Sequence, residues 1–366
     1  MKFEIEREEL LRPLQAVIGV VERRQTLPVL ANVLLVADGD QMEMTATDLE
    51  VELRARFSAR VEQPGQATLP ARKLMDIVRN LPVDAHIEIS VDQERAQVQA
   101  GRSRFTLAVL PAADFPAVEE IGQVESVEIP QNKLRQLIEK THFSMALQDV
   151  RYYLNGLLLE VEPDRLRAVA TDGHRLAMAE QEASIGLQQG RQVIVPRKGI
   201  QELLRLLEAT DDVARVEFGT NHIRVELPEL RFTSKLIDGR FPDYERVIPA
   251  ASERLAQIDR DSLRQALVRA SILSNEKYRG VRFSFEGENL RIQSNNPEQE
   301  EAQEEMMVHY QGEPMEIGFN ASYLLDALNA IEEGGVELVL VDSNSSCLVR
   351  GQGSSDSKYV VMPMRL

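Results

Sequence analysis

The chain has 366 residues, 43% of them hydrophobic, and its 59 Asp and Glu outweigh 42 Lys and Arg to give a formal net charge of −17. This length suits two or three domains of ordinary size, each with its own core. The single cysteine, Cys347, excludes an internal disulfide and a cysteine-based metal cluster, and no apolar run is long enough to span a bilayer. Because Met1 opens an alternating strand directly, we expect no signal peptide and a cytoplasmic protein.

Each third of the chain begins with a short strand and an amphipathic helix. In the first third, residues 1–5 alternate and lead into a helix with Leu10, Leu14 and Val17 on one face. Spacings of three and four residues are typical of a helix with one buried side. The same two elements are predicted at residues 127–138 and 258–270.

A second helix follows later in each third, preceded by a strand. These helices are predicted over residues 70–81, 196–207 and 320–331. The remaining sequence alternates polar and apolar residues and is broken by turn pairs such as Asp38-Gly39 and Glu286-Gly287. Each third is therefore predicted to be an α+β unit with two helices and roughly eight strands in antiparallel sheets.

The three units are copies of one another. Residues 32–48 are similar to residues 155–172 and, more weakly, to residues 280–296; Thr47, Thr171 and Asn295 mark equivalent places at an even spacing. So do Phe105, Phe232 and Tyr359 in a later strand. Short solenoid repeats have periods of 20–50 residues, so this longer period indicates repeated whole domains. We predict domains at 1–124, 125–252 and 253–366, with linkers at 119–125 and 249–253.

Basic residues follow the repeat. A net charge of −17, if evenly spread, would argue against nucleic-acid binding. Instead Lys and Arg gather on the first helices (Arg12, Lys133, Arg135, Lys140, Arg264, Arg269), on two of the second helices (Arg72, Lys73, Arg79, Arg197, Lys198, Arg205) and in loops (Arg23, Arg24, Arg151), whereas the third copy of the second helix has Asp326 and Glu332.

Each basic residue taken alone is more simply the polar face of an amphipathic helix. Repetition at equivalent places favours one shared basic surface. Inside a ring, such a surface would hold duplex DNA through its phosphates without reading its sequence. The chain has no Trp and only 5% aromatic residues, so it is poorly supplied for stacking on single strands.

Residues 298–305 hold five carboxylates. Three interpretations are open. The usual one for a charge run is a solvated edge loop. A metal site would lack a nearby histidine or calcium-loop glycine. A subunit contact would pair the run with Arg102 and with Lys73 or Arg104 of another copy.

Two further segments stand out. Residues 171–175, Thr-Asp-Gly-His-Arg, have side chains common in catalytic sites, but no nucleophile motif accompanies them, and Asp-Gly is a common turn dipeptide. We interpret them as a turn. The apolar C-terminus, residues 360–366, has methionines on both sides of Pro363, which suits an adaptable binding pocket.

Long stretches spread over the whole chain resemble the bacterial DNA sliding clamps, the β subunits of DNA polymerase III: residues 148–156, 170–176, 240–244, 272–277, 295–301 and 359–366. The resemblance implies a non-catalytic processivity factor without cofactors, which encircles duplex DNA as a head-to-tail homodimer, a ring of six clamp domains. It also implies the clamp-loader complex, replicative and translesion DNA polymerases, and mismatch-repair and other clamp-binding-motif proteins as partners.

The resemblance also implies roles for particular residues. DNA-facing positions would be Arg24, Arg72, Gln148, Tyr152 and Tyr153, although the tyrosines are also compatible with ordinary strand positions. The partner-peptide pocket would comprise Leu154, Thr171, Gly173, His174, Arg175, Leu176, Pro242, Arg246, Val247, Ser346, Val360, Met362, Pro363, Met364, Arg365 and Leu366. The dimer interface would comprise Lys73, Arg102, Arg104, Phe105, Leu107, Ile272, Leu273, Glu298, Glu301 and Glu304. Its Phe, Ile and Leu side chains are expected to be exposed on a monomer, where they would be a liability.

Two other classes of function are open. A nuclease would need clustered carboxylates to hold a metal, and residues 298–305 are the only candidate. A peptide-binding scaffold would have the pocket but no role on DNA. Cleavage of duplex with a divalent metal would favour the first, and retention on circular but not linear duplex would exclude the second.

Overall fold

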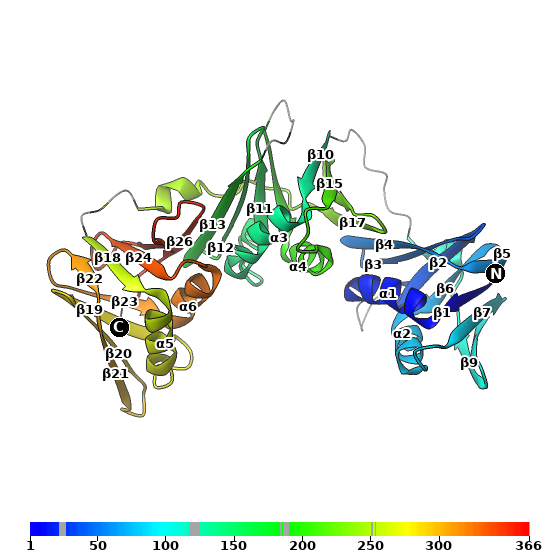
Figure 1. The fold of residues 1–366 in the computed structure, drawn as a ribbon, viewed down its shortest axis with the longest axis horizontal. Coiled ribbons are helices and arrows are strands. Elements are labelled where there is room, and N and C mark those ends of the chain that lie inside the picture. Colours follow the sequence, from blue (N-terminus) through cyan, green and yellow to red (C-terminus); the bar gives the residue numbers. More distant parts are fainter. Residues whose placement is uncertain are drawn as a thin grey trace. The chain divides into compact units, whose positions relative to one another are not determined.

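The computed structural model describes residues 1–21, 27–116, 125–183, 185, 190–249, 252 and 254–365. Within these residues the chain has six α-helices and 26 strands, arranged in four sheets (Figure 1). The α+β prediction is confirmed, and the three copies contain nine, eight and nine of these strands. Both predicted linkers lie largely outside the described residues.

The first copy runs from β1 to β9. Its elements are β1 (Lys2–Glu6), α1 (Arg7–Val17), β2 (Asn32–Asp38), β3 (Gln41–Thr47), β4 (Val51–Ser58), β5 (Arg60–Gln63), β6 (Gly65–Pro70), α2 (Ala71–Asn80), β7 (His86–Asp92), β8 (Arg95–Ala100) and β9 (Ser103–Ala108).

The second copy runs from β10 to β17, followed by a short 3-10 helix, η6 (Tyr244–Val247). Its elements are β10 (Glu125–Pro130), α3 (Gln131–Glu139), β11 (Gly156–Val161), β12 (Arg165–Thr171), β13 (Arg175–Glu182), β14 (Arg191–Pro196), α4 (Arg197–Leu206), β15 (Val213–Phe218), β16 (His222–Glu226) and β17 (Leu230–Lys235).

The third copy runs from β18 to β26. Its elements are β18 (Arg254–Asp259), α5 (Arg260–Ser271), β19 (Gly280–Glu286), β20 (Asn289–Asn295), β21 (Glu301–Met307), β22 (His309–Gln311), β23 (Met315–Asn320), α6 (Ala321–Ala330), β24 (Gly335–Leu340), β25 (Cys347–Gly351) and β26 (Ser357–Val361). The second helices of all copies start and end within one residue of their predicted limits. The acidic run 298–305 is not a loop throughout, because from Glu301 it forms β21, an edge strand.

Sheets continue from one copy into the next. One eight-stranded sheet has the order β10-β15-β16-β17-β4-β3-β2-β6, and one nine-stranded sheet has the order β14-β11-β12-β13-β26-β25-β24-β18-β22. The chain therefore divides into two compact units that cut across the second copy: Met1–Asn132 with Gln201–Leu236, and Lys133–Ile200 with Ile237–Leu366. Smaller sheets complete them, β5-β1-β7-β8-β9 in the first and β21-β20-β19-β23 in the second.

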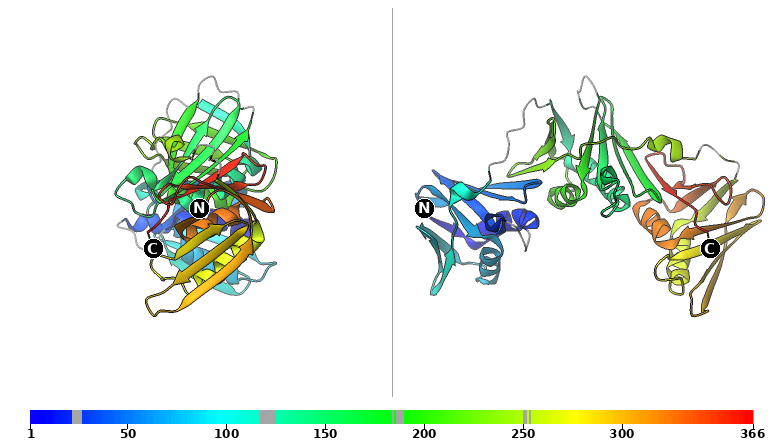
Figure 2. Two further views of the ribbon diagram at one scale, coloured as in Figure 1. Left: turned by 90° about the vertical axis from the view of Figure 1, so that its left-hand side faces the viewer. Right: turned by 180° about the vertical axis from the view of Figure 1, so that it is seen from behind.

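In the second unit, α5 and α6 lie side by side against one face of the four-stranded sheet (Figure 1, Figure 2). Alternation along β19 explains this packing, because Val281, Phe283 and Phe285 are buried while Arg282 is exposed. Leu267 of α5 and Leu324 of α6 belong to the same core. The sheet therefore presents one apolar face to the helices and one polar face to solvent.

The same turn is built twice, at the end of β3 and at the end of β12. The Thr47 hydroxyl accepts from Leu49 N (3.0 Å), and the Asp48 carboxylate accepts from Glu50 N (2.9 Å) and Val51 N (2.7 Å). Thr171 and Asp172 make the equivalent three bonds. This confirms that residues 171–175 form a turn.

We predict that Asp48→Ala lowers the free energy of unfolding by about 1–2 kcal/mol, because two backbone N–H groups lose their acceptor. Asp48→Asn keeps an acceptor oxygen and is the control, with a smaller loss. Urea denaturation measures both. Equal stability of Asp48→Ala and the wild type would show that the turn needs no side-chain acceptor.

Candidate functional site

A small apolar hollow of about 150 Å³ lies in the second unit. It is lined by Arg151, Leu154, Thr171, Gly173, Arg175, Leu176, Pro242, Asp243, Tyr244, Val247, Val360 and Met362. All of these except Arg151, Asp243 and Tyr244 belong to the predicted partner pocket. Residues distant in the sequence thus meet at one place.

Four segments form this hollow, and one of them is residues 151–154, which supplies Arg151 and Leu154. The turn between β12 and β13 supplies Gly173, whose φ of +86° suits glycine, and an added Cβ would meet the Arg151 guanidinium at 3.0 Å. The segment around η6 supplies the opposite wall. Beyond β26, the Met362 N–H donates to the His174 carbonyl (2.9 Å), which holds the C-terminal tail against the turn.

The other predicted pocket residues lie beside the hollow rather than in its lining. Arg246 is exposed and pairs with Asp243 (2.6 Å), and the Ser346 hydroxyl donates to the Val247 carbonyl (3.2 Å). His174 is exposed. Pro363 continues the tail towards a second hollow, and Leu366 lies outside the described residues.

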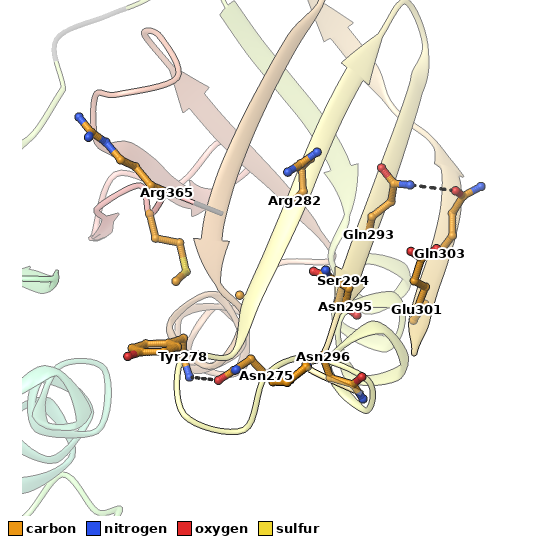
Figure 3. Close-up of a pocket in the computed structure, with 14 residues that line it drawn as sticks. Asn275, Tyr278, Arg282, Gln293, Ser294, Asn295, Asn296, Glu301, Gln303 and Arg365 are labelled. Carbon is orange, nitrogen blue, oxygen red and sulfur yellow. Dashed lines mark hydrogen bonds between the residues drawn. The ribbon is translucent and has the colours of Figure 1, made fainter. Parts of the chain in front are cut away.

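The second hollow, of about 820 Å³, lies on the polar face of the four-stranded sheet (Figure 3). Arg282 and Gln293 project from neighbouring strands, with Tyr278 at one end and the tail residues Met364 and Arg365 beside them. The Met364 N–H donates to the Gly318 carbonyl (2.9 Å) on β23. The tail therefore borders both hollows.

Arg175 connects the turn to helix α6. Its guanidinium lies 4.6 Å from the Tyr323 ring centroid and pairs with Asp172 (3.2 Å) and with Asp326 of α6. Glu332, just after α6, pairs with Lys140 (3.8 Å). The acidic residues that distinguish the third copy of the second helix thus have basic partners from the second copy.

The predicted DNA-facing residues are found in both units. Gln148 is exposed with a φ of +55°, Tyr152 is 57% exposed, and its ring meets the half-buried Tyr153 edge-on at 5.8 Å. In the first unit Arg72 is exposed and donates to the Val21 carbonyl (2.6 Å). Arg24 lies outside the described residues.

The predicted interface residues lie at two sheet edges and nearby helices. Ile272 is 71% exposed at the end of α5, and Phe105 is partly exposed on edge strand β9. Lys73, Arg102, Arg104, Glu298 and Glu301 are exposed, and Leu273 is half-buried. Glu304 already pairs with Arg269 (2.6 Å), whose side chain lowers the pKa of this carboxyl.

The expectation that Leu107 is exposed is wrong. Leu107 is only 7% exposed because alternation along β9 turns it to the interior of its own sheet, whereas Phe105 is less completely covered. Cys347, by contrast, is buried in β25, and burial raises the pKa of its thiol.

Several of the basic helix residues have partners within their own unit. Arg135 pairs with Glu139 (2.9 Å), and Arg205 donates to the Gln15 carbonyl (2.8 Å). Among the described residues, no group of His, Cys, Asp or Glu is arranged to hold a metal ion, and no helix is long and apolar enough to cross a membrane.

His142 precedes Phe143, whose carbonyl accepts a hydrogen bond from Arg175, and the His142 and Phe143 rings meet edge-on at 6.2 Å. Burial lowers the pKa of His142 below its ordinary 6.5, and the nearby Arg197 guanidinium lowers this pKa further. The folded state therefore resists protonation that the unfolded state accepts.

We predict that the contribution of His142 to stability is complete above pH 6.5 and is lost as the pH falls through its lowered folded-state pKa. Urea midpoints at pH 7.5 and pH 5.5 measure this loss. His142→Gln should reduce the difference between the two midpoints. An unchanged difference would mean that other groups cause the pH dependence.

Comparisons with known proteins cover the whole chain. Models of the N-terminal, central and C-terminal domains of the DNA polymerase III beta subunit match residues 1–119, 128–243 and 245–365. The beta sliding clamps of Pseudomonas putida and Escherichia coli K12 are 58% and 51% identical, over 100% of both chains.

Solved structures agree with these matches. The DNA polymerase III subunit beta from Pseudomonas aeruginosa has a TM-score of 0.96 at 57% identity, with full coverage of both chains. A sliding clamp from the same organism bound to griselimycin has a TM-score of 0.95 at 58% identity, again with full coverage.

Three tandem α+β domains joined through their sheet edges are the architecture of a DNA clamp. The chain belongs to the DNA polymerase III beta subunit family, the bacterial sliding clamps.

Proposed function

We propose that two copies of this chain close head to tail into a ring of six domains that encircles duplex DNA and tethers DNA polymerases to it, without catalysis of its own. The observation that carries the proposal is a repeated junction between domains, of which a single chain completes only two. The domain limits 1–124, 125–252 and 253–366 are part of the proposal; the three matched ranges support the number of domains, although the third begins at residue 245.

The two junctions have one design. The fourth strand of the first copy, β4, pairs with the last strand of the second, β17, with Leu53 opposite Phe232. The equivalent β13 of the second copy pairs with the last strand of the third, β26, with Ala177 opposite Tyr359. By the same rule β21 of the third copy requires the last strand of a first copy, β9, and both are edge strands in a single chain.

The repeat also predicts the register of this third junction. Leu53, Ala177 and Glu301 are equally spaced in the sequence, as are Phe105, Phe232 and Tyr359. Phe105 of one copy would therefore lie opposite Glu301 of the other. In an antiparallel pair this sets Arg102 opposite Glu304, a favourable cross-strand charge pair. A rotation that closes after two copies gives a ring rather than a filament.

Contact with DNA would be through phosphates and would carry no sequence information. Arg24, Arg72, Gln148, Tyr152 and Tyr153 remain our candidates. Since the chain as a whole is strongly acidic, direct affinity should be weak and salt-sensitive. A closed ring does not need high affinity, because it is linked topologically to the DNA.

The apolar hollow would bind a short peptide of the clamp loader, of replicative and translesion polymerases, and of mismatch-repair and other clamp-binding-motif proteins. Its apolar lining with a few polar groups suits such anchors. Griselimycin, bound by the P. aeruginosa relative, would occupy the same hollow. The protein would act in the cytoplasm, where bacterial DNA is replicated.

We predict that replacing Ile272 and Leu273 together by alanine weakens dimerisation by on the order of 2–4 kcal/mol, roughly 30- to 1,000-fold in affinity. Analytical ultracentrifugation measures the loss, and Val213→Ala, which also shortens an exposed apolar side chain, is the control. After loading, wild type should remain on circular duplex and slide off linear duplex. A variant that sediments as wild type would contradict the interface, and cleavage of duplex with Mg²⁺ would contradict the non-catalytic role.

We predict that Met362→Ala reduces the affinity for griselimycin by about tenfold or more, because it removes apolar surface from the hollow, while dimerisation is unchanged. Isothermal titration calorimetry measures the affinity. Val213→Ala again serves as the control. Equal affinities of Met362→Ala and the wild type would show that griselimycin does not bind in this hollow.

A further inference from the structure

An ion pair occurs at the same place in all three copies, between the third and fourth strands of each copy. Glu43 is opposite Arg56, Arg167 is opposite Glu180, and Arg291 is opposite Glu305. Their closest atoms are 3.4, 2.7 and 2.9 Å apart. Glu43, Arg167 and Arg291 are equally spaced in the sequence. The repeat therefore supplies the pair, with its charges reversed in the first copy.

Only in the second copy is the arginine of this pair buried. The arginine side chain is 60% exposed in the first copy and 42% in the third, but that of Arg167 is 10% exposed. Exposed pairs contribute little, whereas a buried guanidinium must have every charge and donor satisfied. Something specific to the second copy covers Arg167.

The cover is the segment that carries η6, which also forms a wall of the apolar hollow. Arg167 Nη1 donates to the Tyr244 hydroxyl (2.6 Å) and to Glu160 (3.3 Å), and the Tyr244 hydroxyl donates to the same Glu160 oxygen (2.6 Å). Nη1 also approaches Glu245 (3.4 Å), while Nη2 and Nε are taken by Glu180 (2.7 and 3.0 Å). The second Glu160 oxygen accepts from Gln192 (2.7 Å). Each nitrogen of the Arg167 guanidinium and both oxygens of the Glu160 carboxylate therefore have a hydrogen-bond partner.

Tyr244 belongs both to the apolar hollow and to the hydrogen-bond network around Arg167. Its ring lines the hollow together with Pro242 and Val247 and packs against Phe241, while its hydroxyl lies in the ionic network. Burial raises the pKa of Tyr244, so its hydroxyl stays protonated and remains a donor to Glu160. At the other end of η6, Ser346 holds the Val247 carbonyl. The wall is thus fixed at both ends by polar bonds, to Glu160 of β11 and Arg167 of β12 at one end and to Ser346, just before β25, at the other.

We infer that Arg167 is a positioning residue of the peptide pocket: through Tyr244 it holds the η6 wall in the shape that receives a ligand, without touching the ligand itself. The inference rests on the proposed peptide-binding role of the hollow. Preorganisation of a binding wall raises affinity, because a mobile wall must be ordered at the cost of binding free energy. The buried arginine thus turns an ion pair common to all copies into a support for a site that the second and third copies form together.

Three variants and a control test this. Tyr244→Phe keeps the ring in the hollow and removes only the hydroxyl, Arg167→Gln removes the charge, and the double variant combines them. Arg56→Gln removes the exposed counterpart in the first copy and is the control. Griselimycin binding is measured by isothermal titration calorimetry, with thermal midpoints and sedimentation recorded for every variant.

We expect Tyr244→Phe and Arg167→Gln each to weaken griselimycin binding about five- to tenfold, and the double variant to bind no more weakly than Arg167→Gln alone, because both act through one contact. Dimerisation should be unchanged, and Arg56→Gln should bind as wild type does. A role in stability alone would lower the thermal midpoints and leave affinity within twofold of wild type, which would overturn the inference, as would additive losses. If wild type itself fails to bind griselimycin, the peptide-binding role of the hollow fails first and the inference with it.

Discussion

The pairing of sheet edges between domains is the constraint on which the rest of this structure depends. An open antiparallel sheet leaves backbone donors and acceptors unpaired along both edges, and a repeated domain repeats that problem. Here β17 covers the edge of β4, and β26 covers the edge of β13. The compact units consequently run across domain limits, since each large sheet belongs to two copies. The first and last copies retain β9 and β21 as unmatched counterparts, so the completed architecture requires a second chain.

Differences between the copies, rather than the framework they share, create the binding features. Arg175 follows the same turn as its first-copy counterpart Val51, yet it inserts between aromatic rings and reaches Asp326 on α6. By charge alone, the two carboxylates at the second helix of the third copy are unsuited to a surface that faces DNA. In the fold, Asp326 and Glu332 instead connect the third copy to the second. Charge composition alone does not distinguish a charged group on a DNA-facing surface from one that joins two copies.

Local patterns predicted much of the fold. Helix α2 and its two counterparts start and end within one residue of their predicted limits, because periodicity and the preceding strand depend only on neighbouring residues. The acidic run at residues 298–305 is harder to predict from its sequence, because a charged strand at a sheet edge has the composition of a loop. The family resemblance predicts an exposed Leu107, but strand alternation buries this side chain. Tyr244 lies in one of the stretches that carry the family resemblance, but nothing in the residue itself indicates a place in the pocket.

The sequence by itself determined the number of domains, most of their secondary structure and their similarity to one another, because repeats, periodicity and turn residues are properties of short segments. Only the tertiary structure decided which charges are buried, which strands keep a free edge, and how the turn at 171–175, the η6 segment and the tail meet around one hollow. These features depend on residues that lie far apart in the sequence, such as Arg167 and Tyr244 or His174 and Met362, and no local pattern records the packing that brings them together. Because of this packing, the arginine of the same ion pair is buried in the second copy but exposed in the first and third.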